Sequence, residues 1–230
     1  MVPLINSQLS EGVINVGEKD YKLLDDFLLY PGIQVESLEN KPMVFAGLGI
    51  TEGDWDDYLN IDVKDKIVVV LDGDYRSDGK TNWGKNSNRK RVLAEKNGAA
   101  AFVVLTPQES YNQLKGRMKF YMQRKSTSIN KPMEGEGASI PTFVLDETKV
   151  DSWFVNVKRN RNPVQIRKLI TKKQKSYSSD LDLAWNHQII KVREEYEAAN
   201  VLAYPPGTDS LLKRELLVIT SHYDHIGIVN

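Results

Sequence analysis

The chain has 230 residues, of which 40% are hydrophobic and 27% charged, which is ordinary for one large or two small globular domains. The 31 basic and 31 acidic residues give zero formal net charge, so no global field attracts nucleic acid or an anionic membrane. No apolar run approaches the ~18 residues that span a bilayer, and the absence of Cys excludes disulfides and thiolate metal sites. Residues 1–6 lack the basic start and apolar core of a signal peptide.

Short apolar runs with β-branched members, bounded by Gly, Pro, Asn or Asp, predict strands along the first two thirds of the chain. These runs cover residues 13–16, 27–30, 43–50, 67–71, 99–105 and 140–145. A helix is expected over 89–96, with Val92 and Leu93 facing inward and Asn97-Gly98 ending it. The order strand, helix, strand across 67–105 predicts a βαβ-like unit.

The remaining stretches are more polar. Residues 107–139 read as a long loop, and hydrophobic alternation over 155–200 predicts antiparallel or edge strands with one wet face. The basic clusters within 158–175 are interpreted as the solvent face of such strands rather than a phosphate site. Asp72, Asp74 and Asp78 fit a solvated turn better than a calcium loop, and His187 reads as structural or exposed.

Side chains capable of metal chemistry follow the last apolar run. Residues 216–219 predict a short strand buried on both faces, and His222 and Asp224 come where such a strand ends. Ligands gather at the carboxyl ends of strands in open α/β sheets, and residues two apart in an extended chain point to the same side. A carboxylate commonly orients a zinc-binding imidazole, so the pair suggests a metal site. The simpler interpretation is a histidine whose hydrogen bonds are satisfied at a strand end.

Residues 200–208 and 217–227, the latter containing His222-Tyr223-Asp224-His225-Ile226-Gly227, resemble the opening of the catalytic domain in co-catalytic two-zinc aminopeptidases, metallopeptidase family 28. The resemblance implies that His222 is a zinc ligand and that Asp224 aligns it. It also implies that the general base and the other ligands lie beyond Asn230, so that no catalytic residue falls within this chain. We therefore expect this chain to be an inactive fragment that binds no stoichiometric zinc by itself.

The middle of the chain resembles a protease-associated (PA) domain over roughly residues 40 to 150. The resemblance rests on Gly49-Ile50, Asp57-Tyr58, residues 62–71, residues 96–101 and Ile140-Pro141-Thr142, in the order of that family. Such domains are commonly inserted ahead of the catalytic histidine in two-zinc aminopeptidases. They are thought to shape access to the active site or to bind peptides, and the stretch 107–139 is expected to lie over or beside the cleft.

The fold class expected is α/β (α+β): a β-rich PA domain with a βαβ-like unit, followed by the first strands of an aminopeptidase sheet. The predicted segments are 1–39 (N-terminal flanking strands), 40–154 (PA domain) and 155–230 (start of the catalytic domain).

The function expected is that of a fragment of a zinc aminopeptidase, secreted or periplasmic by resemblance. Its partner would be a peptide or protein substrate, without nucleic acid or a membrane span. The C-terminal strand, lacking later neighbours, would be poorly ordered or would pair with a second chain. The alternative function is a non-catalytic interaction module of a receptor-like relative.

Overall fold

The computed structural model describes residues 2–30, 37–76, 83, 87–123, 125–129, 140–157, 160–198, 202–212, 215 and 217–221. Its strands are β1 (Val2–Val16), β2 (Lys19–Lys22), β3 (Phe27–Leu29), β4 (Leu38–Ala46), β5 (Thr51–Glu52), β6 (Trp55–Asp56), β7 (Ile67–Leu71), β8 (Ala101–Thr106), β9 (Ser126–Ile129), β10 (Thr142–Asp146) and β11 (Ser178–Ala198). The helices are α1 (Ser87–Lys96), α2 (Gln108–Gln123) and α3 (Pro163–Lys173), with 3-10 turns at Glu147–Lys149 and Asp151–Phe154.

One large sheet organises these elements in the order β2-β1-β11-β4-β7-β8-β10-β3, and β9 pairs with β1. The strands β4, β7, β8 and β10 are mutually parallel, while the outer pairings are antiparallel. Eight flat strands would be about 34 Å wide, yet residues 23–26, which join the two outermost strands, reach less than about 20 Å. The sheet must therefore curl until its ends approach each other, and Leu23 forms a bridge with Phe27 there.

The central strands are buried on both faces. In β7, Ile67, Val69 and Leu71 face the main core, whereas Val68 and Val70 pack in a second cluster with Ala94 of α1. This explains the uninterrupted apolar run in the sequence. The mixed α/β fold class and the β7–α1–β8 unit are confirmed.

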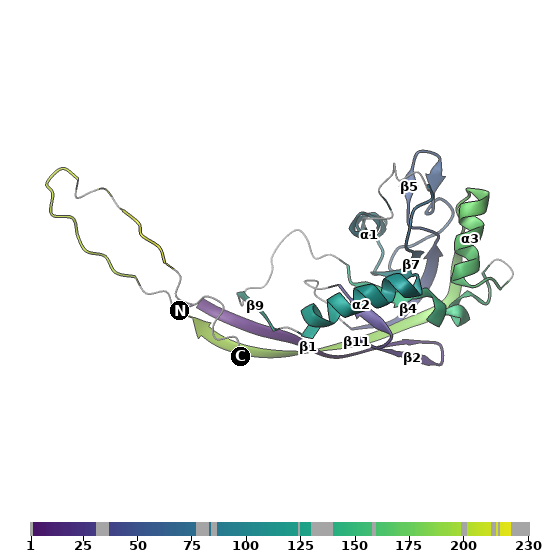
Figure 1. The fold of residues 1–230 in the computed structure, drawn as a ribbon, viewed down its shortest axis with the longest axis horizontal. Coiled ribbons are helices and arrows are strands. Elements are labelled where there is room, and N and C mark those ends of the chain that lie inside the picture. The colour runs from purple at the N-terminus through teal and green to yellow at the C-terminus, as the bar shows by residue number, and fades with distance from the viewer. Residues whose placement is uncertain are drawn as a thin grey trace.

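The longest strands form a ribbon that extends from the body (Figure 1). β1 pairs with β11 from Val2 opposite Ala198 to Val16 opposite Trp185, whereas β4 reaches along β11 only as far as His187. The outer half of the ribbon therefore has only β9 as a further strand neighbour within the described residues. Val2 and Ala198 lie side by side at the ribbon's outer end.

Two predicted elements were wrong. The polar stretch 107–139 contains helix α2, whose residues Tyr111, Met118 and Met122 recur at helical spacing and are buried in the main core. Residues 163–173 form helix α3 rather than a strand, because Asn162 caps its first turn and Pro163 occupies the first helical position. The apolar residues Val164 and Ile166 therefore belong to a helix and not to an alternating strand. Ile190 and Val192 do lie on a strand, as predicted.

The predicted buried strand at 216–219 is also wrong for the residues the structure describes. Residues 217–221 carry no strand, and Leu217 and Ile219 are each 86% exposed. No described strand lies alongside to accept their backbone hydrogen bonds, so no strand pairing within the described part of the chain stabilises the extended form.

The sheet takes strands from all three predicted segments, with β1 to β3 from the first, β7 to β10 from the second and β11 from the third. The boundaries at residues 39 and 154 stay a prediction. Among the described helices, none combines the length and apolar character that crossing a membrane requires.

A buried carboxylate holds the turn that follows β4. Asp57 is 1% exposed, and its Oδ2 accepts the backbone N–H groups of Leu48 and Ile50, at 3.1 and 3.0 Å, and the indole N–H of Trp55. The hydroxyl of Ser176 donates to Oδ1, linking this turn to the segment after α3. Burial raises the pKa of Asp57, while these donors act in the opposite direction.

Glycine is required in this turn. Gly47 has a φ of +51°, and a Cβ on it would lie 2.4 Å from Oδ1 of Asp57.

We expect Asp57→Ala to lower the free energy of unfolding by about 2–4 kcal/mol, because three buried N–H groups lose their acceptor. Asp57→Asn is the matched control: its amide oxygen can accept in the position of Oδ2, and its amide nitrogen can donate to Ser176. It should cost clearly less in urea unfolding at pH 7. An equal loss for Ala and Asn would contradict this role.

Candidate functional site

The predicted metal residues, His222 and Asp224, lie outside the described residues. Within the described part of the chain, no three or more His, Asp or Glu side chains gather as a metal ion requires. His187 is buried, its Nδ1 accepts the indole N–H of Trp185 at 2.8 Å, and its ring lies 4.9 Å from that of Phe143. Of the two interpretations of His187, structural or exposed, this placement agrees with the structural one.

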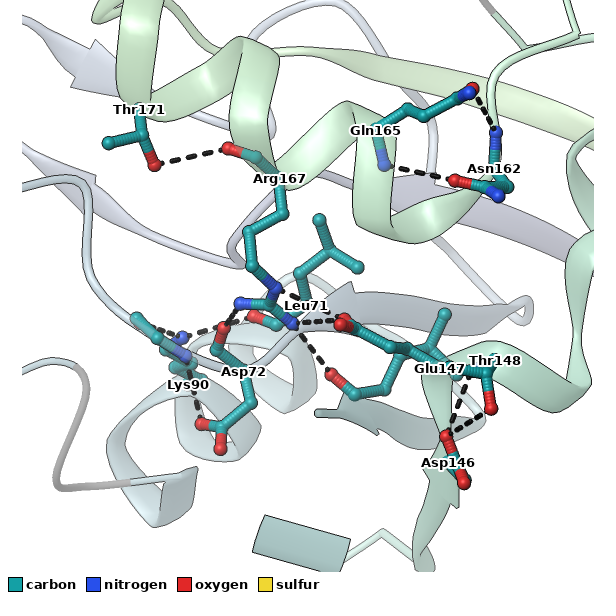
Figure 2. A network of polar contacts seen from close by, with 12 residues as sticks. Leu71, Asp72, Lys90, Asp146, Glu147, Thr148, Asn162, Gln165, Arg167 and Thr171 are labelled. Atoms are coloured by element: carbon teal, nitrogen blue, oxygen red, sulfur yellow. Dashed lines mark hydrogen bonds and ion pairs between the residues drawn. The ribbon is translucent and has the colours of Figure 1, made fainter. Parts of the chain in front are cut away.

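The carboxyl ends of β7, β8 and β10, where ligands gather in many α/β proteins, are occupied by an arginine from α3. Figure 2 shows the guanidinium of Arg167 between the end of β7 and Glu147. It donates to the carboxylate of Glu147, at 3.1 Å from Nε, to the carbonyl of Leu105 at 3.3 Å, and to the carbonyl of Asp72. The sequence predicts Arg167 on a solvent-exposed basic face, which is wrong: its guanidinium joins α3 to the edge of the sheet.

A lysine completes this network from the side of α1. Lys90 is 1% exposed, and its Nζ donates to the carbonyls of Gly73 at 2.6 Å and Leu71 at 3.4 Å. Burial lowers the pKa of Lys90 to about 8, although the nearby carboxylates of Asp72 and Asp57 partly oppose this. The amine is enclosed and bonded to backbone carbonyls, so it stabilises the end of β7 rather than meeting a substrate.

The aspartates after β7 act within their own turn. Asp72 accepts the N–H of Gly73, and Asp74 accepts the N–H groups of Arg76 and Trp83. Asp78 lies outside the described residues. These bonds agree with a turn for Asp72 and Asp74.

An open groove runs along β1, with a cavity volume of about 660 Å³. Residues 6–13 of β1 line it, together with residues 22–25, Met122 of α2, Lys125 before β9, and Val192 and Glu194 of β11. Its polar and apolar lining suits an extended chain better than a small apolar molecule. Sequence reasoning missed this groove, because its residues come from four elements and none carries a recognisable motif.

A smaller cavity of about 400 Å³ lies between residues 54–60 and 174–178, beside Asp57. Because the carboxylate of Asp57 already accepts four hydrogen bonds, it is a structural acceptor there.

No protein-family model matches the sequence, and no curated protein matches it. Among solved structures, the chain is similar to an aminopeptidase from Aneurinibacillus sp. strain AM-1, with 14% identity, a TM-score of 0.40, and coverage of 84% of this chain and 36% of that one. It is also similar to BSAP, a zinc aminopeptidase from Bacillus subtilis, with 13% identity, a TM-score of 0.34, and coverage of 87% and 38%. The chain thus spans little more than a third of either structure, and likenesses this distant carry no argument about activity.

The lowered pKa of Lys90 predicts a specific pH dependence of stability. Between about pH 8 and 10.5 the amine of Lys90 is protonated in the unfolded chain and largely deprotonated in the folded one, so the contribution of Lys90 to stability rises with pH. The full rise attributable to Lys90 is about 3 kcal/mol. It should be absent in Lys90→Met and present in Lys96→Met, an exposed position on the same helix. Urea unfolding from pH 7 to 10.5 measures this, and identical slopes for wild type and Lys90→Met would contradict it.

Proposed function

We propose that this chain is part of a zinc-dependent aminopeptidase, with His222 as a zinc ligand and Asp224 as the carboxylate that orients its ring. The observation that carries the proposal is the sequence His222-Tyr223-Asp224-His225-Ile226-Gly227 directly after an apolar β-branched run. A carboxylate bound to the second imidazole nitrogen selects the tautomer that can ligate a metal. Neither residue lies in the described part, so the assignment rests on this motif and its resemblance.

The ribbon supports a PA-type insertion. Val2 pairs with Ala198, so the two ends of the body formed by residues 2–198, which contains the PA-like region, lie together, a geometry that suits insertion into a larger protein. We assign the PA-like region to residues 40–154, with flanking strands from 1–39 and the start of the catalytic domain in 155–230. Its role would be to shape substrate access or to bind peptides.

The stretch 107–139 cannot be tested for that role by simple deletion. Tyr111, Met118 and Met122 of α2 lie in the main core, so removing them would unfold the body. Any effect of this stretch on substrate preference must be sought with substitutions on exposed positions.

In the whole enzyme, bound zinc would lower the pKa of a water molecule and polarise the substrate carbonyl. His222 would bind as neutral imidazole and Asp224 would hold its orientation, while the general base would come from beyond Asn230. A single histidine is too few protein ligands for tight binding, so the 230-residue chain is proposed to be inactive alone.

The substrate class proposed is peptides, cleaved at the amino terminus, and the location proposed is secreted or periplasmic. The exposed apolar residues 217–219 would find their neighbours in the remainder of the catalytic sheet or, without it, in a second chain.

The first test is made in the product of the complete reading frame. Asp224→Asn should reduce zinc affinity or aminopeptidase activity by about 10–100-fold, and His222→Ala should reduce both further. His187→Gln is the control, because that histidine is buried and can be replaced by another acceptor for Trp185. Wild-type protein without zinc and without activity on any amino-terminal residue would refute the proposal and favour the non-catalytic interaction module.

The second test uses the 230-residue chain itself. Equilibrium dialysis against micromolar zinc should leave less than stoichiometric metal on the protein, with no difference between wild type and His222→Ala. One or two tightly held zinc ions per chain, lost on His222→Ala, would show that the site is complete within these residues.

A further inference from the structure

The groove along β1 contains a length of strand edge that no other described strand covers. On this side of β1, β9 pairs with residues 4–7 and β2 pairs with residues 13–16. Leu23 donates to the carbonyl of Gly12, which closes the gap from the β2 side. Residues 9–11 thus lie between the two neighbouring strands and line the groove. An edge of this kind can accept an extended chain through backbone hydrogen bonds.

Two irregularities of the backbone lie at the same place. Leu9 pairs with Lys191 and Glu11 with Ile190, so Ser10 is the extra residue of a β-bulge. Leu24, which also lines the groove, has a φ of +68°, a left-handed conformation that is rare for a bulky side chain. Bulges and strained residues both concentrate next to functional sites.

The charges around the gap favour a basic occupant. Glu11 and Asp25 are exposed in the lining, and neither carboxylate forms an ion pair with a described residue. Glu194 is neutralised by Lys125 at 2.7 Å, and Lys22 is the remaining cation among the lining residues. The amines of Lys115 and Lys149 donate to the backbone carbonyl of Asp25, so the preference for a basic occupant rests on Glu11. The exposed apolar surface of Val13, with that of Val192, offers contact for the alternate side chains of a bound strand.

We propose that this groove binds an extended peptide segment, which adds as a strand beside residues 9–11 and places a basic side chain against Glu11. The inference deepens the proposed peptide-handling role of the PA-like body and rests on it. The groove consists entirely of described residues and involves neither His222 nor any residue beyond Asn230. It would therefore hold peptide whether or not the amino terminus of that peptide can be cleaved.

The test uses blocked peptides, which no aminopeptidase can process. The pentapeptide acetyl-Thr-Val-Arg-Val-Thr-amide, carrying a fluorophore, is titrated with the 230-residue chain and followed by fluorescence anisotropy. The comparison peptides replace Arg by Glu, or N-methylate the Val that follows Arg and so remove one backbone donor. We expect saturable binding of the Arg peptide, weakened about tenfold by either change.

The matched protein variants are Glu11→Lys and Glu18→Lys. Glu18 is exposed in the turn between β1 and β2 and lies outside the groove lining, so its reversal changes net charge equally. Glu11→Lys should weaken the Arg peptide about tenfold and Glu18→Lys should leave it unchanged, with both variants unfolding at the wild-type temperature.

Three results would overturn the inference. The first is no saturable binding up to about 1 mM peptide, where only contacts weaker than about 4 kcal/mol would remain undetected. The second is equal binding by the Arg and Glu peptides, or equal weakening by Glu11→Lys and Glu18→Lys. The third is a concentration-dependent dimer in sedimentation that Glu11→Lys dissociates, since the groove would then hold a second copy. If blocked peptide binds while the whole protein lacks zinc and activity, the groove stands and the aminopeptidase proposal fails.

Discussion

The antiparallel pairing of β1 with β11 is the constraint on which the rest of the structure depends. It joins the first strand of the chain to a strand that begins at Ser178, and so encloses every other element of the body between its two members. Its inner half carries Trp185 into the main core, while its outer half extends beyond β4. The same pairing brings the entrance and exit of the chain together and leaves one edge of β1 partly uncovered.

Buried polar groups set the shape of the opposite end of the sheet. Arg167 and Lys90 donate hydrogen bonds to the carbonyls at the ends of β7 and β8. Asp57 accepts hydrogen bonds from the backbone N–H groups of the turn after β4. Buried donors and acceptors without partners would cost more than these bonds contribute, so the positions tolerate little change. Since these groups satisfy one another, the carboxyl edge of the parallel strands serves stability, and the accessible groove lies along the ribbon.

The proposed zinc motif and the groove depend on different structural features. The motif needs further ligands and a sheet into which residues 217–219 can pack, because a metal ion takes several ligands and an apolar strand needs neighbours. The groove needs only the curl of the sheet, the bulge at Ser10 and the position of α2 against the ribbon.

Sequence alone determined the elements whose signal is local. The run of β-branched residues at Ile67–Leu71, the helix closed by Asn97-Gly98 and the strand after it could be predicted, because propensity and turn chemistry agree there. The motif at His222 is equally local, and it remains a sequence prediction. Only tertiary structure decided that 108–123 is a helix, because it is stabilised by a few buried residues among many polar ones. The helix at 163–173 does have a local start signal, Asn162 before Pro163, which the apparent alternation of apolar residues obscured. Tertiary structure also decided the burial of Lys90 and Arg167 and the groove beside residues 9–11, since these depend on contacts between residues far apart in the chain, which no local pattern records.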